Sequence, residues 1–158
     1  MSVILQGYQL DRLNFGTQVI KAAQAFPQTQ TLTLYTVTGG LILVTALIGQ
    51  VTTATTTDPG LTLGCGTPTV GGTLDTDGIA TTTALTSAEV GTLVTVAASS
   101  GLPGALVVGT LAGSAAFLAG APFVVNSGTI TWTTSASHAG QMKWWLSYVP
   151  IDIGASVS

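Results

Sequence analysis

The C-terminal stretch 128–158 constrains the fold of this chain most, because all three of its tryptophans lie there. Residues 129–133 alternate threonine with an apolar residue, Ile130 or Trp132, as in a strand with one buried face. A second alternating run, 141–150, follows a loop of serine, alanine and glycine that contains His138. The pattern predicts a β-hairpin that carries the three tryptophans.

The second arm of this predicted hairpin is apolar on both faces. One face consists of Met142, Trp144, Leu146 and Tyr148. The other face carries Trp145 and Val149 beside Lys143, and it is too apolar to be left in water. We therefore expect Trp144 to pack in the core, with its neighbours on that face, and Trp145 to point the other way.

A second hairpin is predicted nearer the N-terminus. Residues 31–38 alternate, and Gly39-Gly40 supplies two residues that accept the positive φ of a type I′ turn. Residues 41–48 follow as a run that is apolar on both faces. Such a run indicates a central strand that is covered from two sides, or one that is covered by another subunit.

The rest of the chain also favours strands. Threonine, which is β-branched and suits a half-exposed sheet, occurs 28 times. Further strands are predicted at 61–63, 73–74, 79–83, 91–98, 105–111 and 122–125, with an Asp-Gly turn at 75–78. About eight to ten short antiparallel strands at this spacing are typical of an all-β sandwich, a jelly roll or a small barrel. A length of 158 residues suits one such domain.

Residues 1–30 differ from this β domain, which we place at 31–158. They hold Arg12 and Lys21, two of the three basic residues, and no clear alternation. Thr17 is a candidate cap for a short helix over 17–25 that would end before Pro27. A plain N-terminal strand followed by a linker is an equal alternative. That strand and linker is the alternative to our interpretation of 1–30 as an arm that gains order by lying on the same chain or on a neighbour.

Charge excludes several classes of partner. Charged residues make up 6% of the chain, against about 25% in ordinary domains. Three scattered basic residues cannot form a nucleic-acid surface. The uncharged stretch 104–125 approaches the length of a membrane helix, but Pro103 and Pro122 bracket it, alanine and glycine dominate it, and no Lys or Arg flanks it. We expect neither a nucleic acid nor a membrane as partner.

Reactive groups are too few to predict an enzyme, a metal site or a cofactor. The single histidine, His138, lies in a predicted loop, where we expect it to be solvated. The single cysteine, Cys65, has no cationic neighbour in sequence that would activate it, so we expect a packing role. The first residues show no basic segment followed by an apolar run, which predicts a product that stays where it is made or leaves inside an assembly.

Three stretches resemble a family of small β-rich virion proteins of tailed bacteriophages, the head decoration or cement proteins. They read LYTVTGGLILVTALIGQVTT at 34–53, PFVVNSGTI at 122–130 and KWWLSYVPIDIGA at 143–155. The resemblance covers roughly residues 31–157, and its motifs are structural rather than catalytic. It implies a β-module, commonly a trimer, that is made in the host cytoplasm, binds the major capsid protein on the outside of the head and reinforces the joints between capsomers.

The expected contacts follow from this reading and from the apolar strands. The candidate interface residues are Ile42, Val44, Ile48, Trp145 and Val149 for the homo-oligomer, and Arg12 and Lys21 in the arm that reaches the capsid. One alternative is a carbohydrate-binding or adhesive fibre or tail module, in which Trp132, Trp144 or Trp145 would stack on sugar rings. A second alternative is a tail-tube or other subunit of the same virion.

Overall fold

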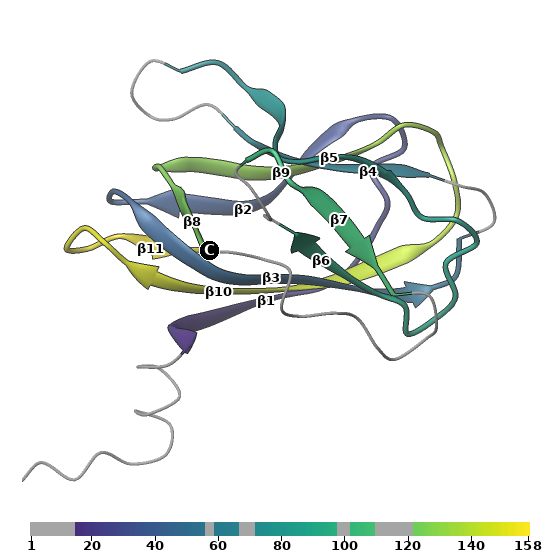
Figure 1. Cartoon of the computed structure of the whole chain (residues 1–158), viewed down its shortest axis with the longest axis horizontal. Helices are drawn as coiled ribbons and strands as arrows, with labels where there is room; N and C mark the ends of the chain where they lie inside the picture. The colour runs from purple at the N-terminus through teal and green to yellow at the C-terminus, as the bar shows by residue number, and fades with distance from the viewer. Residues whose placement is uncertain (1–14, 56–58, 67–71, 98–101, 110–121) are drawn as a thin grey trace, which may run out of the picture.

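Two antiparallel sheets packed face to face form the molecule (Figure 1). The computed structural model describes residues 15–55, 59–66, 72–97, 102–109 and 122–158. Within these residues the strands are β1 (Thr17–Ala25), β2 (Thr31–Thr38), β3 (Ile42–Thr53), β4 (Gly60–Cys65), β5 (Asp75–Ala84), β6 (Leu93–Ala97), β7 (Ala105–Val108), β8 (Phe123–Val125), β9 (Gly128–Thr134), β10 (Gln141–Pro150) and β11 (Ser156–Val157). The all-β, sandwich-like fold expected from the sequence is confirmed.

Each sheet has a C-terminal strand in its interior. The six-stranded sheet has the order β1-β10-β3-β6-β7, and β8 pairs with the first part of β3. The five-stranded sheet has the order β11-β2-β9-β4-β5. Thus β10 lies between β1 and β3, and β9 lies between β2 and β4.

Both predicted hairpins are wrong, because the strands of each pair lie in different sheets. β9 belongs to the five-stranded sheet and β10 to the six-stranded sheet, and β2 and β3 are divided in the same way. Gly39 and Gly40 do have positive φ values, 77° and 130°, but they carry the chain across the sandwich instead of closing a hairpin. A Cβ at Gly39 would lie 2.4 Å from the carbonyl oxygen of Gly154, so contact with the C-terminal segment also requires glycine there.

Residues 17–25 form the edge strand β1, so the possible helix over this range is wrong. The main chain of β1 pairs with β10, and Val19 packs against the core while Gln18 and Ile20 point outward. A nine-residue helix has too few hydrogen bonds to compete with such an edge. The structure therefore places residues 17–25 on the body of the same chain; residues 1–14 of the predicted arm lie outside the described residues.

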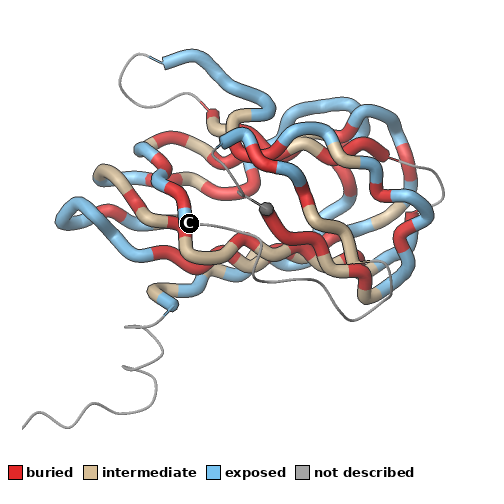
Figure 2. Tube along the Cα trace, in the orientation of Figure 1, coloured by how far each residue is buried: buried red, intermediate tan, exposed pale blue. Residues whose placement is uncertain are grey.

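The core fills the space between the two sheets (Figure 2). The expectation that Trp132 and Trp144 are packing residues is confirmed, because both are 0% exposed and their rings meet edge to face with centroids 5.8 Å apart. Phe26, just after β1, packs against Trp132 at 5.8 Å. Gly49 on the inner side of β3 leaves room for the Trp144 ring, which a Cβ would approach to 2.9 Å.

The two long sides of the sandwich differ. On one side β5 and the start of β7 are joined by a parallel bridge between Ala80 and Gly104, with main-chain hydrogen bonds of 2.9 Å from Thr81 and 3.0 Å to Ile79. On the other side, β1 and β11 are edge strands that do not pair with each other. Among the described residues, the backbone thus links the two sheets by β pairing on one side only.

The middle of the chain departs from expectation in small ways. Residues 75–78, predicted as a turn, are the start of β5, and residues 73–74 are not a strand. The predicted strand 105–111 is described only to residue 109, and it ends at 108.

Candidate interaction face

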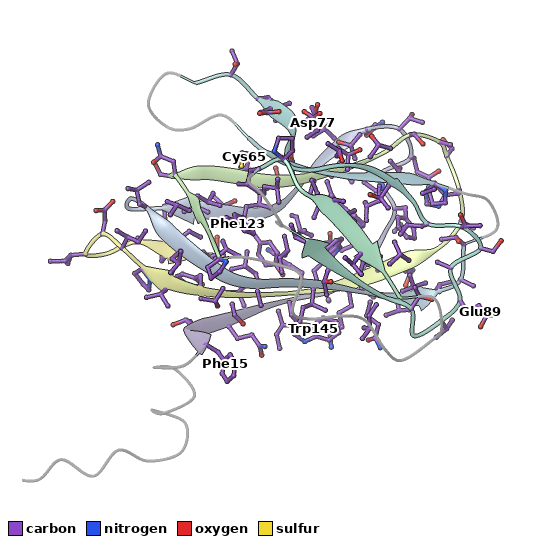
Figure 3. The ribbon with its side chains drawn as sticks, in the orientation of Figure 1. Phe15, Cys65, Asp77, Glu89, Phe123 and Trp145 are labelled. Carbon is purple, nitrogen blue, oxygen red and sulfur yellow. The ribbon has the colours of Figure 1, made fainter. Side chains whose placement is uncertain are left out.

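The outward side of the six-stranded sheet is apolar. We call it the apolar face, and it consists of Phe15, Ile20, Leu43, Ile48, Leu93, Val107, Val124, Trp145 and Val149. Figure 3 shows Phe15 and Trp145 on this side, away from the five-stranded sheet. Four of these side chains are markedly exposed, Phe15 by 56%, Ile20 by 52%, Val124 by 51% and Val149 by 37%.

Strand register arranges these side chains in rows across the sheet. In the central row Ile20, Trp145 and Ile48 are direct cross-strand neighbours on β1, β10 and β3, and the row continues through β6 to β7. In a second row Val149, Leu43 and Val124 are neighbours on β10, β3 and β8. Direct neighbours lie about 5 Å apart at their Cβ atoms, so Ile20, Trp145 and Ile48 form one apolar strip and the second row forms another. Thr95 on β6 interrupts the first strip before it reaches Val107 on β7.

Phe15 continues the second row toward the N-terminus. Its carbonyl oxygen accepts a hydrogen bond of 2.7 Å from Thr45 Oγ1 on β3. Gly16 follows against the backbone of Tyr148, where a Cβ would meet the carbonyl oxygen at 2.1 Å. This close approach fixes where the chain enters β1, beside Val149.

Lys143 is the one charged side chain that points outward from the described strands of this sheet. Its Nζ lies 4.8 Å from the centre of the Trp145 ring, in a cation–π contact. The ring attracts the ammonium without neutralising it, so the described strands of this face carry one positive charge.

The predicted interface residues divide between the inside and the outside of the sheet. Ile42 and Val44 are 0% exposed and belong to the core, so their predicted place at an interface is wrong. Ile48 does point outward, beside Trp145. The cause is a β-bulge in β3 at Thr45 and Ala46, where the register with β10 shifts and the alternation reverses.

The structure describes one of the two basic residues predicted to reach the capsid, and their contact with a capsid stays a prediction. Lys21 on β1 points inward, and its Nζ lies 5.7 Å from the centre of the buried Tyr35 ring. Arg12 lies outside the described residues. Sequence reasoning missed Phe15, Ile20, Leu43 and Val124; a period-two reading of residues 17–21 would have placed Ile20 on the face.

The opposite side of the sandwich is built from threonine. We call it the threonine face, and its main members are Thr31, Thr33, Thr36, Thr62, Thr82, Thr129 and Thr133. Thr31 and Thr133 share a hydrogen bond of 2.8 Å between their hydroxyls, and Thr62 and Thr82 share one of 3.0 Å. Thr62 and Thr133 are cross-strand neighbours, which joins the two pairs into one row.

His138 is buried, so the expectation of a solvated loop histidine is wrong. Its ring packs on Phe26 with centroids 4.4 Å apart, and Nδ1 lies 3.2 Å from the carbonyl oxygen of Ala139. The Gln28 side chain binds the His138 backbone twice: Oε1 accepts from the amide N–H at 3.1 Å, and Nε2 donates to the carbonyl oxygen. His138 thus anchors the connection from β9 to β10.

No reactive cluster emerges from the described part of the chain. Burial, and secondarily the nearby Asp75 carboxylate, raise the pKa of the Cys65 thiol, which disfavours the nucleophilic thiolate. Within residues 15–55, 59–66, 72–97, 102–109 and 122–158, no group of three His, Cys, Asp or Glu side chains could hold a metal ion. The same residues contain no helix of the length and apolarity that crossing a bilayer requires.

Comparison of the chain with protein families, curated proteins and solved structures found no match.

Proposed function

We propose that this protein is a structural subunit of a virion, a decoration or cement protein that binds the outside of a tailed-phage head. The observation that carries the proposal is the apolar face: the outward side of one sheet carries the exposed apolar side chains Phe15, Ile20, Val124 and Val149 in a chain with 6% charged residues. Exposed apolar surfaces of this extent belong to interaction sites. A stable assembly covers such a surface permanently, and the sequence resemblance supplies the kind of assembly.

The proposed role needs binding but no chemistry. A subunit that binds the intact shell and not the disrupted one shifts the equilibrium toward the intact shell, by about 2.7 kcal/mol per site at a free concentration of 100 times Kd. The partners are the major capsid protein and further copies of this chain, with three copies expected from the resemblance. The location is the outer surface of the capsid.

The sugar-binding alternative loses most of its basis. Trp132 and Trp144 are fully buried and cannot stack on a ligand. Trp145 is half-buried, and the Lys143 ammonium occupies a position over its ring.

Binding to undecorated phage heads tests the proposal. Purified protein should co-sediment with heads to a saturable level and should raise the temperature at which the heads release their DNA. A reconstruction of the virion should then show density for a β-sandwich on the head. Absence of co-sedimentation, or density located in the tail, would refute a role in head decoration.

A deletion that leaves β1 in place tests whether the predicted arm binds the capsid. Removing residues 1–30 would delete β1 and the core residue Phe26, so loss of binding would only report unfolding. Removing residues 1–14 leaves both in place. If these residues reach the capsid, the truncated protein stays folded and binds heads more weakly; unchanged binding contradicts a role for the arm.

A further inference from the structure

The apolar face has the size of a protein–protein interface. At about 3.4 Å per residue and about 4.8 Å between strands, β1, β10, β3, β6, β7 and β8 present roughly 700 Å² to one side. A stable interface of standard size takes about 800 Å² from each partner. One face can therefore supply most of the contact that a permanent subunit interface needs.

The composition of the face suits a second copy of itself. Its central row holds an aromatic anchor, Trp145, between Ile20 and Ile48. Tryptophan at the centre of an apolar patch is typical of residues that dominate binding energy. The only outward charge of the described strands, Lys143, lies beside this row in contact with Trp145, so each copy brings a single charge to the contact.

The edges of the sheet are less suited to association than its face. The register of β1 with β10 shifts between Lys21 and Gln24. Lys21 also points inward, and an inward charge on an edge strand discourages pairing with another strand. The side formed by β7 is occupied by the bridge to β5. Association through an edge would also leave the apolar face uncovered.

We infer that the apolar face is covered by the same face of further copies of this chain, arranged around a common symmetry axis. This inference rests on the proposed function and names the partner of its surface. The capsid then contacts other parts of the subunit. The alternatives, that the capsid protein or residues 1–14 of the same chain cover the face, are separate outcomes of the experiment below.

The experiment compares matched lysine substitutions on the two sides of the sandwich. Ile20→Lys on edge strand β1 is paired with Thr31→Lys at the end of β2 that β11 does not cover, and both positions are exposed. Ile48→Lys in the interior of its sheet is paired with Thr62→Lys in the interior of the other, and both positions are half-buried. Light scattering after size exclusion gives the mass of each full-length variant, and near-ultraviolet circular dichroism reports whether the buried Trp132 and Trp144 remain packed.

The wild type should be an oligomer at micromolar concentration. Ile20→Lys and Ile48→Lys should dissociate it, raising the dissociation constant at least tenfold, while Thr31→Lys and Thr62→Lys leave the mass unchanged. A monomeric wild type overturns the inference, as does an oligomer that Ile20→Lys and Ile48→Lys leave intact. If deletion of residues 1–14 converts a monomer into an oligomer, the arm covers the face in its own chain and the inference is also overturned.

Head binding separates this inference from the proposed function. Protein that is monomeric but still saturates heads contradicts the inference and leaves the proposed function standing. Protein that is oligomeric through the apolar face but binds no heads supports the inference and contradicts the proposed function.

Discussion

The two outer faces of the sandwich have the same backbone geometry and opposite surface chemistry. On the threonine face, hydroxyls of neighbouring strands bond to each other, as in the Thr31–Thr133 pair at 2.8 Å. On the apolar face the corresponding positions hold isoleucine, leucine, valine and tryptophan. The threonine face remains compatible with water without using any charge.

This contrast shows how the proposed interface can differ from the rest of the surface in a chain with few charges. In ordinary proteins an interface differs from the remaining surface by a depletion of charge, but here charge is scarce everywhere. The loss of threonine hydroxyls is the distinguishing feature instead. Four substitutions test this contrast between the two faces.

Trp132→Ala should have the largest effect, because both faces depend on one core. Trp132 comes from the five-stranded sheet and meets Trp144 from the six-stranded sheet. Truncation of a buried tryptophan costs about 3–5 kcal/mol. Urea unfolding at low protein concentration should show this loss, whereas Trp145→Ala, on the apolar face, should alter mass by light scattering far more than stability. Equal losses for the two variants would contradict the assignment of Trp145 to the outside.

Gln28→Ala tests the connection from β9 to β10, which leads from one sheet to the other. Removing both hydrogen bonds to the His138 backbone leaves polar groups of a partly buried loop without partners, at a cost of about 1–3 kcal/mol. Thermal unfolding measures the loss. Gln30→Ala, an exposed position two residues away, is the control and should be near neutral.

Replacing two residues of the threonine face with isoleucine should create a second surface through which copies associate. Thr62→Ile with Thr133→Ile places two apolar side chains next to each other across β4 and β9. Isoleucine suits a strand, so stability should change by less than about 1 kcal/mol, while the mass by light scattering should rise with concentration. The double serine variant keeps the hydroxyls and should behave as wild type. An unchanged mass for the isoleucine variant would show that threonine hydroxyls do not protect this face.

Substitution of Tyr35 should change the free energy of unfolding least at neutral pH, and it should change its pH dependence at high pH. Burial raises the pKa of Tyr35 above its ordinary value of 10.0, so the folded state holds the phenol proton more tightly than the unfolded state. The resulting stability is complete below about pH 10 and is lost as the pH rises further. Tyr35→Phe should flatten the fall in unfolding free energy between about pH 10 and 12, and an unchanged slope would contradict this assignment.

The sequence was sufficient to tell inside from outside on β9 and β10, which alternate regularly around the tryptophans. Period-two alternation correctly placed Trp132 and Trp144 in the core and Trp145 outside, because each strand alternates whatever its partners are. It could not assign strands to sheets. A glycine turn with positive φ is compatible with a hairpin and with a crossing between sheets, and only tertiary contacts such as that of Gly39 with Gly154 decide.

The candidate site was harder to predict than the fold for the same reason. The bulge at Thr45 and Ala46 has no local sequence signal, yet it moves Ile48 to the opposite side from Ile42 and Val44. β1 was ambiguous because its alternation is short and half polar. The apolar face follows from the strand register, which places Ile20, Trp145 and Ile48 side by side and which the sequence does not specify.

The interior positions of β9 and β10 have a consequence for biosynthesis. β2 and β4 cannot be joined before β9 arrives, and β1 and β3 cannot be joined before β10 arrives. Neither sheet can therefore close until residues 128–150 have left the ribosome, and because most of the pairing is non-local, we expect closure of the sandwich to be slow.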